Sequence, residues 1–254
     1  MSDLTAFSLA GKRILVTGAN TGIGQGIAVS IARAGGAVIG VGRSSMADTA
    51  SKVAALDGEF KAVAADLANT GAAGPMLDRV WDESGPLDGL VNNAGIIRRA
   101  DAVDLTETDW DDVIDVNLKT VFLLSQSFAR RVLADGGRGK IVNIASVLSF
   151  QGGIRVASYT ASKHGVLGIT RLLACEWAAK GINVNGIAPG YIETNNTQAL
   201  RADPDRSAAI LGRIPAGRWG EPGDIGDAAV FLLAPASNYM HGAVVPVDGG
   251  WLAR

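Results

Sequence analysis

The sequence predicts an α/β domain of the doubly wound type, with a seven-stranded parallel sheet and helices on both faces. Short runs rich in Val and Ile alternate along the chain with longer segments of helical periodicity. This alternation, with strands that are almost wholly apolar, is typical of a parallel sheet covered on both sides. No linker, repeat or low-complexity tract divides the 254 residues, so we expect a single domain over residues 1–254.

The elements follow in order from local signals. Apolar runs rich in β-branched residues predict strands at residues 12–17, 37–41, 60–64, 87–91, 140–144, 182–187 and 244–247. Helical periodicity predicts helices at residues 23–34, 46–56, 72–83, 106–133, 157–180 and 224–233. Gly35 ends the first helix, and Thr106 with Asp109 forms a capping-box start for the fourth. Residues 189–218 are predicted to be an irregular substrate-loop region with one or two short helices.

Composition excludes several classes of protein. Hydrophobic residues make up 48% of the chain, which excludes a disordered protein, and the net charge of −2 offers no basic excess for nucleic acid. The single cysteine, Cys175, excludes an intrachain disulfide, and its place in a helix predicts a packed thiol. Residues 1–10 lack a signal-peptide pattern, and no apolar run reaches about 18 residues. We therefore expect a soluble, cytoplasmic protein without a membrane partner.

The first strand leads directly into a glycine-rich turn, residues 17–24 (TGANTGIG), and then into a helix. Gly18 permits a tight turn, while Gly22 and Gly24 let the backbone approach a pyrophosphate at the helix N-terminus, where N–H groups are free. The spacing is G-x3-G-x-G and not the general G-x-G-x-x-G. The alternative is a plain strand–helix turn, but three glycines in this context favour a nucleotide site.

The end of the second strand bears on the choice between nicotinamide cofactors. An acidic residue there would bind the adenosine ribose of NAD, but this chain has Arg43 and Ser44. Arg43 can offer two N–H donors to a 2′-phosphate, so the sequence favours NADP and leaves NAD open. Alternatively, Arg43 stacks on adenine or faces solvent. Asp66, after the third strand, either reaches the adenine amino group or caps a helix.

A tyrosine and a lysine point to the chemistry. Tyr159 and Lys163 lie four residues apart in a predicted helix and share a face, and Ser146 follows the fifth strand at the same edge of the sheet. A nearby ammonium lowers the pKa of a phenol, which is otherwise about 10. The pair can then move a proton to or from a substrate oxygen while hydride moves at carbon. Alone, such a pair is usually a surface contact; with the glycine turn and Ser146, the catalytic interpretation is favoured.

With these motifs, and with residues 92–95 (NNAG), Asn117 and residues 189–190 (PG), the chain resembles the single-domain short-chain dehydrogenases/reductases over nearly its whole length. The resemblance implies a Rossmann fold, an NAD(P)-dependent oxidoreductase acting on CH–OH groups, a homotetramer and no metal. It implies that Tyr159 is the general acid/base and that Lys163 holds the nicotinamide ribose and tunes Tyr159. Ser146 would steady the substrate oxygen, and Asn117 would hold a water in a proton relay.

Motifs and resemblance together give an expected cofactor-binding set. Its members are Gly18, Asn20, Thr21, Gly22, Ile23, Gly24, Arg43, Ser44, Asp66, Leu67, Asn93, Ala94, Gly95, Tyr159, Lys163, Pro189, Gly190, Ile192 and Thr194. One departure from the family matters, because NADP-preferring relatives often carry a second basic residue where this chain has Asn20 and Thr21. Residues 191–217 form a long irregular segment, so we expect them to become ordered when the cofactor binds.

Finer resemblance indicates the sugar-acid group of the family. This group includes the gluconate 5-dehydrogenases and the 2-deoxy-D-gluconate 3-dehydrogenases, also named 2-dehydro-3-deoxy-D-gluconate 5-dehydrogenases. The similar runs are residues 92–99 (NNAGIIRR), 149–155 (SFQGGIR), 190–197 (GYIETNNT) and 247–254 (VDGGWLAR). An arginine fork binds a carboxylate well, so we expect Arg155 or Arg99 to bind the substrate carboxylate. Gln151, Asn195 and Asn196 are expected to bind its hydroxyls. The alternatives are surface ion pairs for the arginines and loop capping for the amides.

Two rival functions stay open. One is a carbonyl reductase of the same family for 3-oxoacyl or steroid substrates, which a basic patch for a carrier protein or a wide apolar pocket would favour. The other is a non-catalytic NAD(P)-sensing regulatory protein, a class that usually lacks the tyrosine or the lysine; this chain has Ser146, Tyr159, Lys163 and Asn117. The seven carboxylates of residues 101–115 favour a solvated helix start over a metal site.

Overall fold

Seven parallel strands form the central sheet of the computed structural model, which describes residues 5–254. The strands are β1 (Arg13–Thr17), β2 (Ala37–Gly42), β3 (Phe60–Ala64), β4 (Gly89–Asn92), β5 (Gly139–Ile144), β6 (Ile182–Pro189) and β7 (Val244–Val247). They lie in the order β3-β2-β1-β4-β5-β6-β7, and every neighbouring pair is parallel. The predicted seven-stranded parallel sheet of a doubly wound fold is confirmed.

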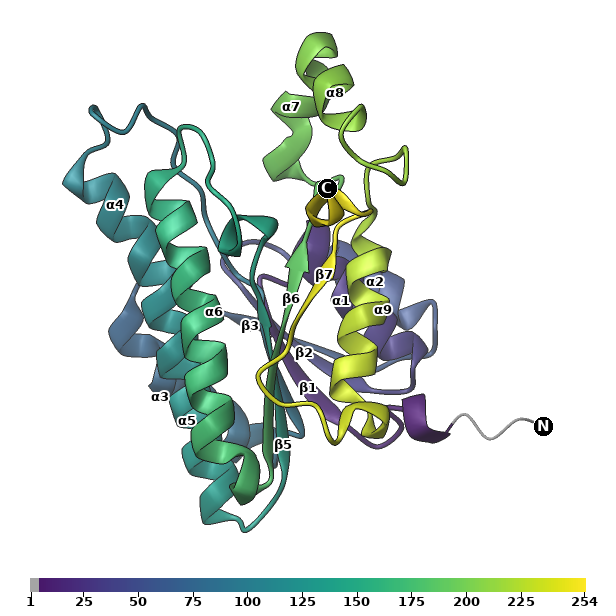
Figure 1. Cartoon of the computed structure of the whole chain (residues 1–254). Coiled ribbons are helices and arrows are strands. Elements are labelled where there is room, and N and C mark those ends of the chain that lie inside the picture. Colours follow the sequence, from purple (N-terminus) through teal and green to yellow (C-terminus); the bar gives the residue numbers. More distant parts are fainter. Residues whose placement is uncertain (1–4) are drawn as a thin grey trace.

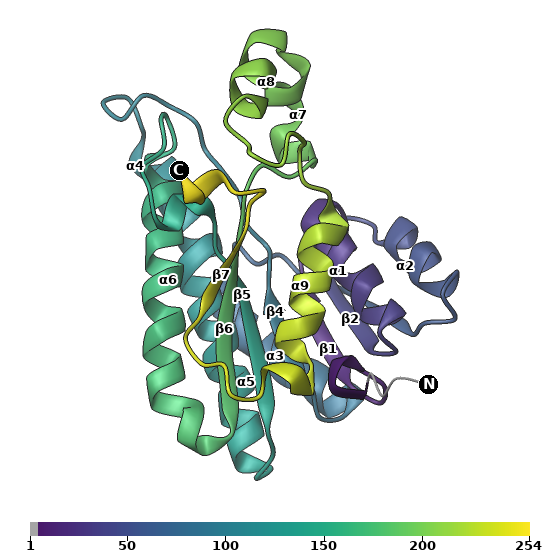
Figure 2. The same ribbon diagram turned by 45° about the vertical axis from the view of Figure 1, so that its right-hand side comes forward.

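Helices cover both faces of this sheet. The longer ones are α1 (Gly22–Arg33), α2 (Ala47–Ala54), α3 (Thr70–Ser84), α4 (Glu107–Ile114), α5 (Thr120–Ala134), α6 (Ala157–Trp177) and α9 (Pro222–Leu233). Figures 1 and 2 show α3, α4, α5 and α6 on one face and α1, α2 and α9 on the other. The helices expected at residues 23–34, 46–56, 72–83, 157–180 and 224–233 are thus present, with ends shifted by up to three residues.

Two apolar cores, one on each side of the sheet, hold these layers together. Side chains alternate along a strand, so Leu90 and Ile141 enter one core while their neighbours Val91 and Val142 enter the other. Phe128 of α5 is fully buried in the first core. Burial on both faces fixes the strands rigidly, and their carboxyl ends therefore make a firm frame for a site.

The helix predicted over residues 106–133 begins as expected but is not uniform. Thr106 caps it, because its Oγ1 accepts a hydrogen bond from the Asp109 N–H at 3.1 Å. The second half of the predicted capping box is not formed among residues 5–254, since the Asp109 carboxylate instead accepts a hydrogen bond from Arg98 Nε at 3.1 Å. A π-helical turn at Asp115–Lys119 then separates α4 from α5. Such turns in α-helices are frequent at functional sites. A π-helical turn holds one residue more than an α-helical turn. The hydrophobic periodicity of the sequence does not reveal this extra residue, because the apolar stripe continues after the turn.

Beyond the carboxyl ends of the strands, the segment after β6 projects from the body of the molecule (Figures 1 and 2). It contains a 3-10 turn at Asn195–Thr197 and two short helices, α7 (Gln198–Ala202) and α8 (Pro204–Leu211). The prediction of one or two short helices here is confirmed. Neither α7 nor α8 buries a residue, so neither packs as a core helix does.

One packing prediction is wrong. Cys175 is exposed and not packed, because it lies outside the buried stripe of α6 that includes Thr170, Ala174 and Trp177.

Within residues 5–254, no helix has the length and apolar character needed to cross a membrane.

Candidate active site

A cavity of about 650 Å³ opens at the carboxyl ends of the strands. It lies where β1 and β4 are neighbours although they are not consecutive in sequence, and such a switch point is the usual place for a ligand in a doubly wound sheet. Every residue of the expected cofactor-binding set lines this cavity, and so do Ser146, Asn195 and Asn196. Asn117, Arg99, Gln151 and Arg155 are not part of its lining.

The glycine-rich turn forms one wall, and the glycines are there because side chains would not fit. Gly18 has φ +67°, and a Cβ on Gly24 would collide with the Gly18 carbonyl oxygen. Thr21, the residue before α1, makes no side-chain cap, so the first N–H groups of the helix have no side-chain acceptor from it. Asn93 ties the turn to the end of β4, because its Nδ2 donates to the Thr17 carbonyl at 2.9 Å. The wall thus offers a close-approach surface and helix N–H donors, which suits a pyrophosphate.

The far end of the cavity carries the residues expected to choose the cofactor. Asn20 Nδ2 donates to Ser44 Oγ at 2.7 Å, and Arg43 extends beside them with 68% of its side chain exposed. Its guanidinium lies 3.9 Å from the Asp66 carboxylate. Asp66 also accepts the Ala68 N–H at 3.0 Å, so it caps a turn while facing the cavity. Arg43 is held only weakly, and its donors remain available to a phosphate.

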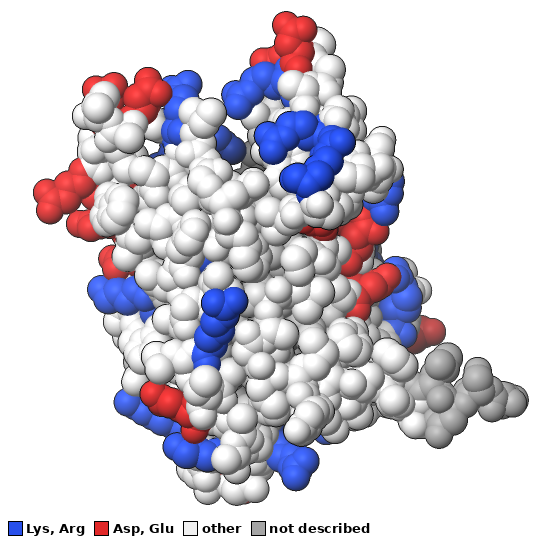
Figure 3. All heavy atoms as spheres, viewed as in Figure 1, with Lys and Arg blue, Asp and Glu red and all other residues white. Residues whose placement is uncertain are grey.

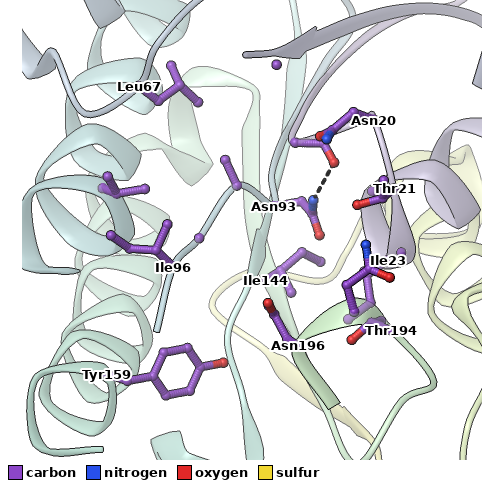
Figure 4. Close-up of a pocket in the computed structure, with 18 of the residues that line it drawn as sticks. Asn20, Thr21, Ile23, Leu67, Asn93, Ile96, Ile144, Tyr159, Thr194 and Asn196 are labelled. Atoms are coloured by element: carbon purple, nitrogen blue, oxygen red, sulfur yellow. Dashed lines mark hydrogen bonds between the residues drawn. The ribbon is translucent and has the colours of Figure 1, made fainter. Parts of the chain in front are cut away.

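Tyr159 and Lys163 reach the opposite wall from α6, and Ser146 reaches it from the end of β5. Figure 4 shows the Tyr159 ring pointing into the cavity, across from Thr21 and Ile23 of the glycine-rich turn. Lys163 is buried and its Nζ donates to the Ile144 carbonyl at 2.7 Å. Its Nζ also lies 5.5 Å from the centroid of the Tyr159 ring. The structure therefore brings the serine, the tyrosine and the lysine to one place.

Burial sets the proton affinities of this pair. Burial raises the pKa of Tyr159, while interaction with the Ser146 hydroxyl and the positive charge of Arg99 act in the opposite direction. Burial also lowers the pKa of Lys163 to about 8. The lysine is thus still mostly an ammonium at neutral pH, and a positive charge beside the ring favours the phenolate. Tyr159 can hold its proton in one direction of a reaction and lose it in the other.

Asn117, in the π-helical turn, lies behind this site. Its Oδ1 accepts the Ile96 N–H at 2.8 Å, and its Nδ2 donates to the Ile96 carbonyl at 2.9 Å and to Ser162 Oγ at 3.3 Å. Ser162 in turn donates to the Tyr159 carbonyl at 2.7 Å. The asparagine therefore joins the segment after β4 to the turn of α6 that carries the tyrosine.

The arginines expected to bind substrate differ in their partners. Arg155 pairs with Asp101 at 3.3 Å and has φ +63°, an unusual backbone conformation for arginine. Arg98 pairs with Asp109 and Asp112. Arg99 has no ion pair within residues 5–254; its Nη2 donates to the Asn196 carbonyl at 3.3 Å. Arg99 thus reaches toward the projecting segment with its charge unneutralised.

Several cavity residues were not identified from the sequence. They are Gly42, Ala65, Ala68, Ile96, Arg98, Asp112, Val116, Ile144, Ala145 and Thr197. Most adjoin an expected residue at the end of a strand, so a wider window around each strand end would have found them. Asp112 and Val116 come from α4 and the π-helical turn, and no sequence signal distinguishes them from other positions of a long helix.

Comparison with known proteins agrees with this geometry. A family model described as enoyl-(acyl carrier protein) reductase matches residues 18–252. A 2-dehydro-3-deoxy-D-gluconate 5-dehydrogenase of Escherichia coli is 56% identical over 251 residues, which cover 99% of each chain. A protein of Agrobacterium tumefaciens proposed to be a 2-deoxy-D-gluconate 3-dehydrogenase, solved with bound NADP, is 59% identical with a TM-score of 0.93, covering 98% of this chain and 99% of that one. A gluconate 5-dehydrogenase of Burkholderia cenocepacia, solved with NADP and tartrate, is 37% identical with a TM-score of 0.94 over the whole of both chains.

Proposed function

The chain belongs to the short-chain dehydrogenase/reductase family, and we propose that it interconverts a secondary hydroxyl and a ketone of a sugar acid with NADP as the hydride carrier. One observation carries the proposal: Ser146, Tyr159 and Lys163 meet in the same cavity as the whole expected cofactor-binding set. The names of the compared relatives, all sugar-acid dehydrogenases, support the substrate class.

The residues of the cavity fit NADP. The glycine wall and the N-terminus of α1 suit the pyrophosphate, and Arg43 with Ser44 suits a 2′-phosphate. Two of the compared structures contain NADP, which supports the same choice. NADPH, when bound, supplies the hydride that reduces the substrate carbon. Lys163 would hold the nicotinamide ribose, and Tyr159, Ile192 and Thr194 would line the nicotinamide end of the cavity.

Side chains of the protein transfer the proton that the substrate oxygen gains or loses. The hydroxyls of Ser146 and Tyr159 hold the substrate oxygen, and Tyr159 gives it a proton as the carbonyl becomes an alcohol. The Lys163 ammonium stabilises the phenolate that remains. A water at Asn117 would return the proton through Lys163. In the oxidation direction the Tyr159 phenolate takes the proton from the substrate hydroxyl instead.

Arg99 would bind the substrate carboxylate. It is free of ion pairs within the described part of the chain, its positive charge lowers the pKa of Tyr159, and it donates a hydrogen bond to Asn196, which lines the cavity. Arg155 is the weaker candidate, because Asp101 already neutralises it. Figure 3 shows the surface hollowed between the tip that carries α7 and α8 and the tip above α4, with basic side chains on both sides. Gln151 and Asn195 would bind hydroxyls of the substrate.

The absorbance of reduced nicotinamide tests the proposed reaction. The purified chain is given NADP⁺ with 2-dehydro-3-deoxy-D-gluconate or D-gluconate, and NADPH with 5-keto-D-gluconate. The comparison substrates are a 3-hydroxyacyl thioester with NADP⁺ and a 3-oxoacyl thioester with NADPH. Turnover of a sugar acid that is lost in Tyr159→Phe is the expected result. Turnover of the 3-oxoacyl substrate alone would contradict the sugar-acid assignment.

We also propose that the enzyme is a homotetramer in the cytoplasm, as the family resemblance implies. Exposed apolar side chains support an association between subunits. Three of them are Trp110 of α4, Leu133 of α5 and Leu172 of α6. These three helices cover the same face of the sheet (Figure 1). Light scattering of the purified protein should give four times the chain mass of 26.1 kDa, and a monomer mass would contradict it.

A further inference from the structure

The end of the chain packs beneath the projecting α7 and α8. Figure 1 shows the C-terminus at the base of these two helices. Trp251 is 4% exposed and belongs to a small apolar cluster with Val147 and Ile214, flanked by Tyr191 and Leu252. Val147 directly follows Ser146, and Tyr191 stands between two residues that line the cavity. The cluster therefore adjoins the active site from behind.

Hydrogen bonds fix the C-terminal segment, residues 248–254, in this place. The Asp248 carboxylate accepts the N–H groups of Gly250 and Leu252, both at 2.9 Å. The Gly249 carbonyl accepts the Ala216 N–H at 3.0 Å, and the Arg254 guanidinium donates to the Gly212 carbonyl at 2.7 Å. Gly212 and Ala216 belong to the turn that follows α8. The segment is thus bound to the exit of α8 by contacts from both of its ends.

The Trp251 ring provides the apolar part of the contact. The Tyr191 ring lies 4.7 Å from it between centroids, and the Arg213 guanidinium carbon lies 4.0 Å from its centroid. Tyr191 also meets Trp219 edge to face at 5.6 Å. Aromatic pairs and cation–π contacts of this kind stabilise the groups that they join. Trp251 therefore contacts both ends of the projecting segment: Tyr191, where the chain leaves the sheet, and Arg213, where it returns after α8.

The same segment has a few other contacts: Arg99 donates to the Asn196 carbonyl at 3.3 Å, Arg201 pairs with Glu193 at 3.6 Å, and two residues of α8, Ile210 and Leu211, pack against the Trp251 cluster. No residue of α7 or α8 is buried. At the base, Gly190 leaves no space for a side chain, because a Cβ there would lie 2.6 Å from the Asp248 Cα. Gly190, Ile192 and Thr194 line the cavity at its nicotinamide end. A shift of the C-terminal segment would consequently be transmitted to residues that face the cofactor.

We propose that Trp251 is a positioning residue of the active site, which acts through Tyr191 and Arg213 to hold residues 190–213 over the cavity. It touches neither cofactor nor substrate. The effect of Trp251 on turnover rests on the proposed function. Its effect on the position of residues 190–213 does not. Loss of the ring should free the segment, weaken binding of the sugar acid and leave the proton chemistry of Tyr159 unchanged.

The test compares Trp251→Ala with Trp81→Ala. Trp81 is a matched control, because it is 6% exposed and packs edge to face on Phe128 in the core beside α3 and α5, away from the cavity. With saturating NADPH, thermolysin should cleave Trp251→Ala between residues 195 and 213 about tenfold faster than wild type, since both ring contacts are lost. The KM for the sugar acid should rise by a similar factor while the pH profile of kcat stays in place. Trp81→Ala should lower the melting temperature without either change.

Equal cleavage of Trp251→Ala and wild type would overturn the proposal, and so would equal effects of the two tryptophan variants. If Trp251→Ala does not fold, Arg213→Gln decides, because the Arg213 side chain is exposed and its replacement removes the cation–π contact while both aromatic rings stay in place. Faster cleavage of Arg213→Gln supports the proposal, and wild-type cleavage overturns it. A wild-type enzyme that turns over no sugar acid would refute the proposed function, while the protease comparison would still decide the role of Trp251.

Discussion

The Nζ of Lys163 lies 5.5 Å from the centroid of the Tyr159 ring and donates its hydrogen bond to the Ile144 carbonyl, not to the phenol. The lysine therefore acts on the tyrosine through its charge. Both residues come from consecutive turns of α6, so the helix fixes their separation. The hydrogen bond to the end of β5 anchors the ammonium to the rigid sheet. A charge held this way favours the phenolate without competing with substrate for the hydroxyl.

Removal of the Tyr159 hydroxyl should abolish turnover and spare cofactor binding. Without it, no group in the cavity can give the substrate oxygen a proton in step with the hydride, and general acid–base catalysis of this kind contributes about 10² to 10⁴ in rate. We expect kcat of Tyr159→Phe to fall by at least that factor. The dissociation constant of NADPH, from quenching of protein fluorescence, should change by less than about twofold, because the ring is kept. Substantial remaining turnover would assign the proton transfer to another group.

The buried ammonium of Lys163 should reduce stability below its pKa. Burial lowers the pKa from 10.5 in the unfolded chain to about 8 in the folded one. Between these two values the unfolded chain binds more protons, so the free energy of unfolding rises with pH across the window. From neutral pH to about pH 10, wild type should gain on the order of 2 kcal/mol over Lys163→Met. Urea titrations of the cofactor-free proteins measure this, and parallel pH curves would contradict it.

Arg43 should decide between the two nicotinamide cofactors. A hydrogen-bonded charge pair contributes about 1.5 to 3 kcal/mol, so Arg43→Ala should lower kcat/KM for NADPH by about tenfold or more. NADH carries no 2′-phosphate, and its kcat/KM should stay the same. Arg33→Ala is the control, because Arg33 is an exposed arginine at the other end of α1 that pairs with Asp227 at 3.7 Å. An equal loss with both cofactors would show that Arg43 does not recognise the phosphate.

The fold and most of the cavity could be predicted because both depend on local signals. A parallel sheet places every strand end at one edge, so Gly18 after β1, Asn93 after β4 and Pro189 at the end of β6 were expected together from sequence order alone. Positions such as these need only a correct strand boundary. The prediction does not depend on the conformations of their side chains.

Tertiary partners could not be predicted in the same way. Cys175 is exposed because of the rotation of α6 about its axis, which sequence periodicity gives only approximately. The pairing of Arg155 with Asp101 depends on two loops that meet in the fold although they are 54 residues apart in sequence. The contact of Trp251 with Tyr191 likewise joins the last residues of the chain to the segment after β6. Each depends on long-range geometry that no local pattern encodes.

The contrast between Arg99 and Arg155 leads to the last prediction. Arg99 has no acidic partner within residues 5–254 and its charge acts on Tyr159, whereas Arg155 is paired with Asp101. If Arg99 binds the substrate carboxylate, Arg99→Gln should raise the KM for a sugar acid by about tenfold or more. An uncharged analogue, with an amide in place of the carboxylate, should lose far less. Arg155→Gln is the matched control, and its KM should stay within about twofold of wild type, as expected for an exposed ion pair.

The same variant has a second, independent consequence for pH dependence. The positive charge of Arg99 lowers the pKa of Tyr159, so its removal should raise that pKa. Oxidation needs the phenolate, and the rising limb of its kcat profile should move to higher pH in Arg99→Gln and stay in place in Arg155→Gln. A raised KM without this shift would mean that Arg99 binds substrate too far away to act on Tyr159. A shift without a change in KM would assign Arg99 to the electrostatics of the tyrosine and leave the carboxylate to another arginine.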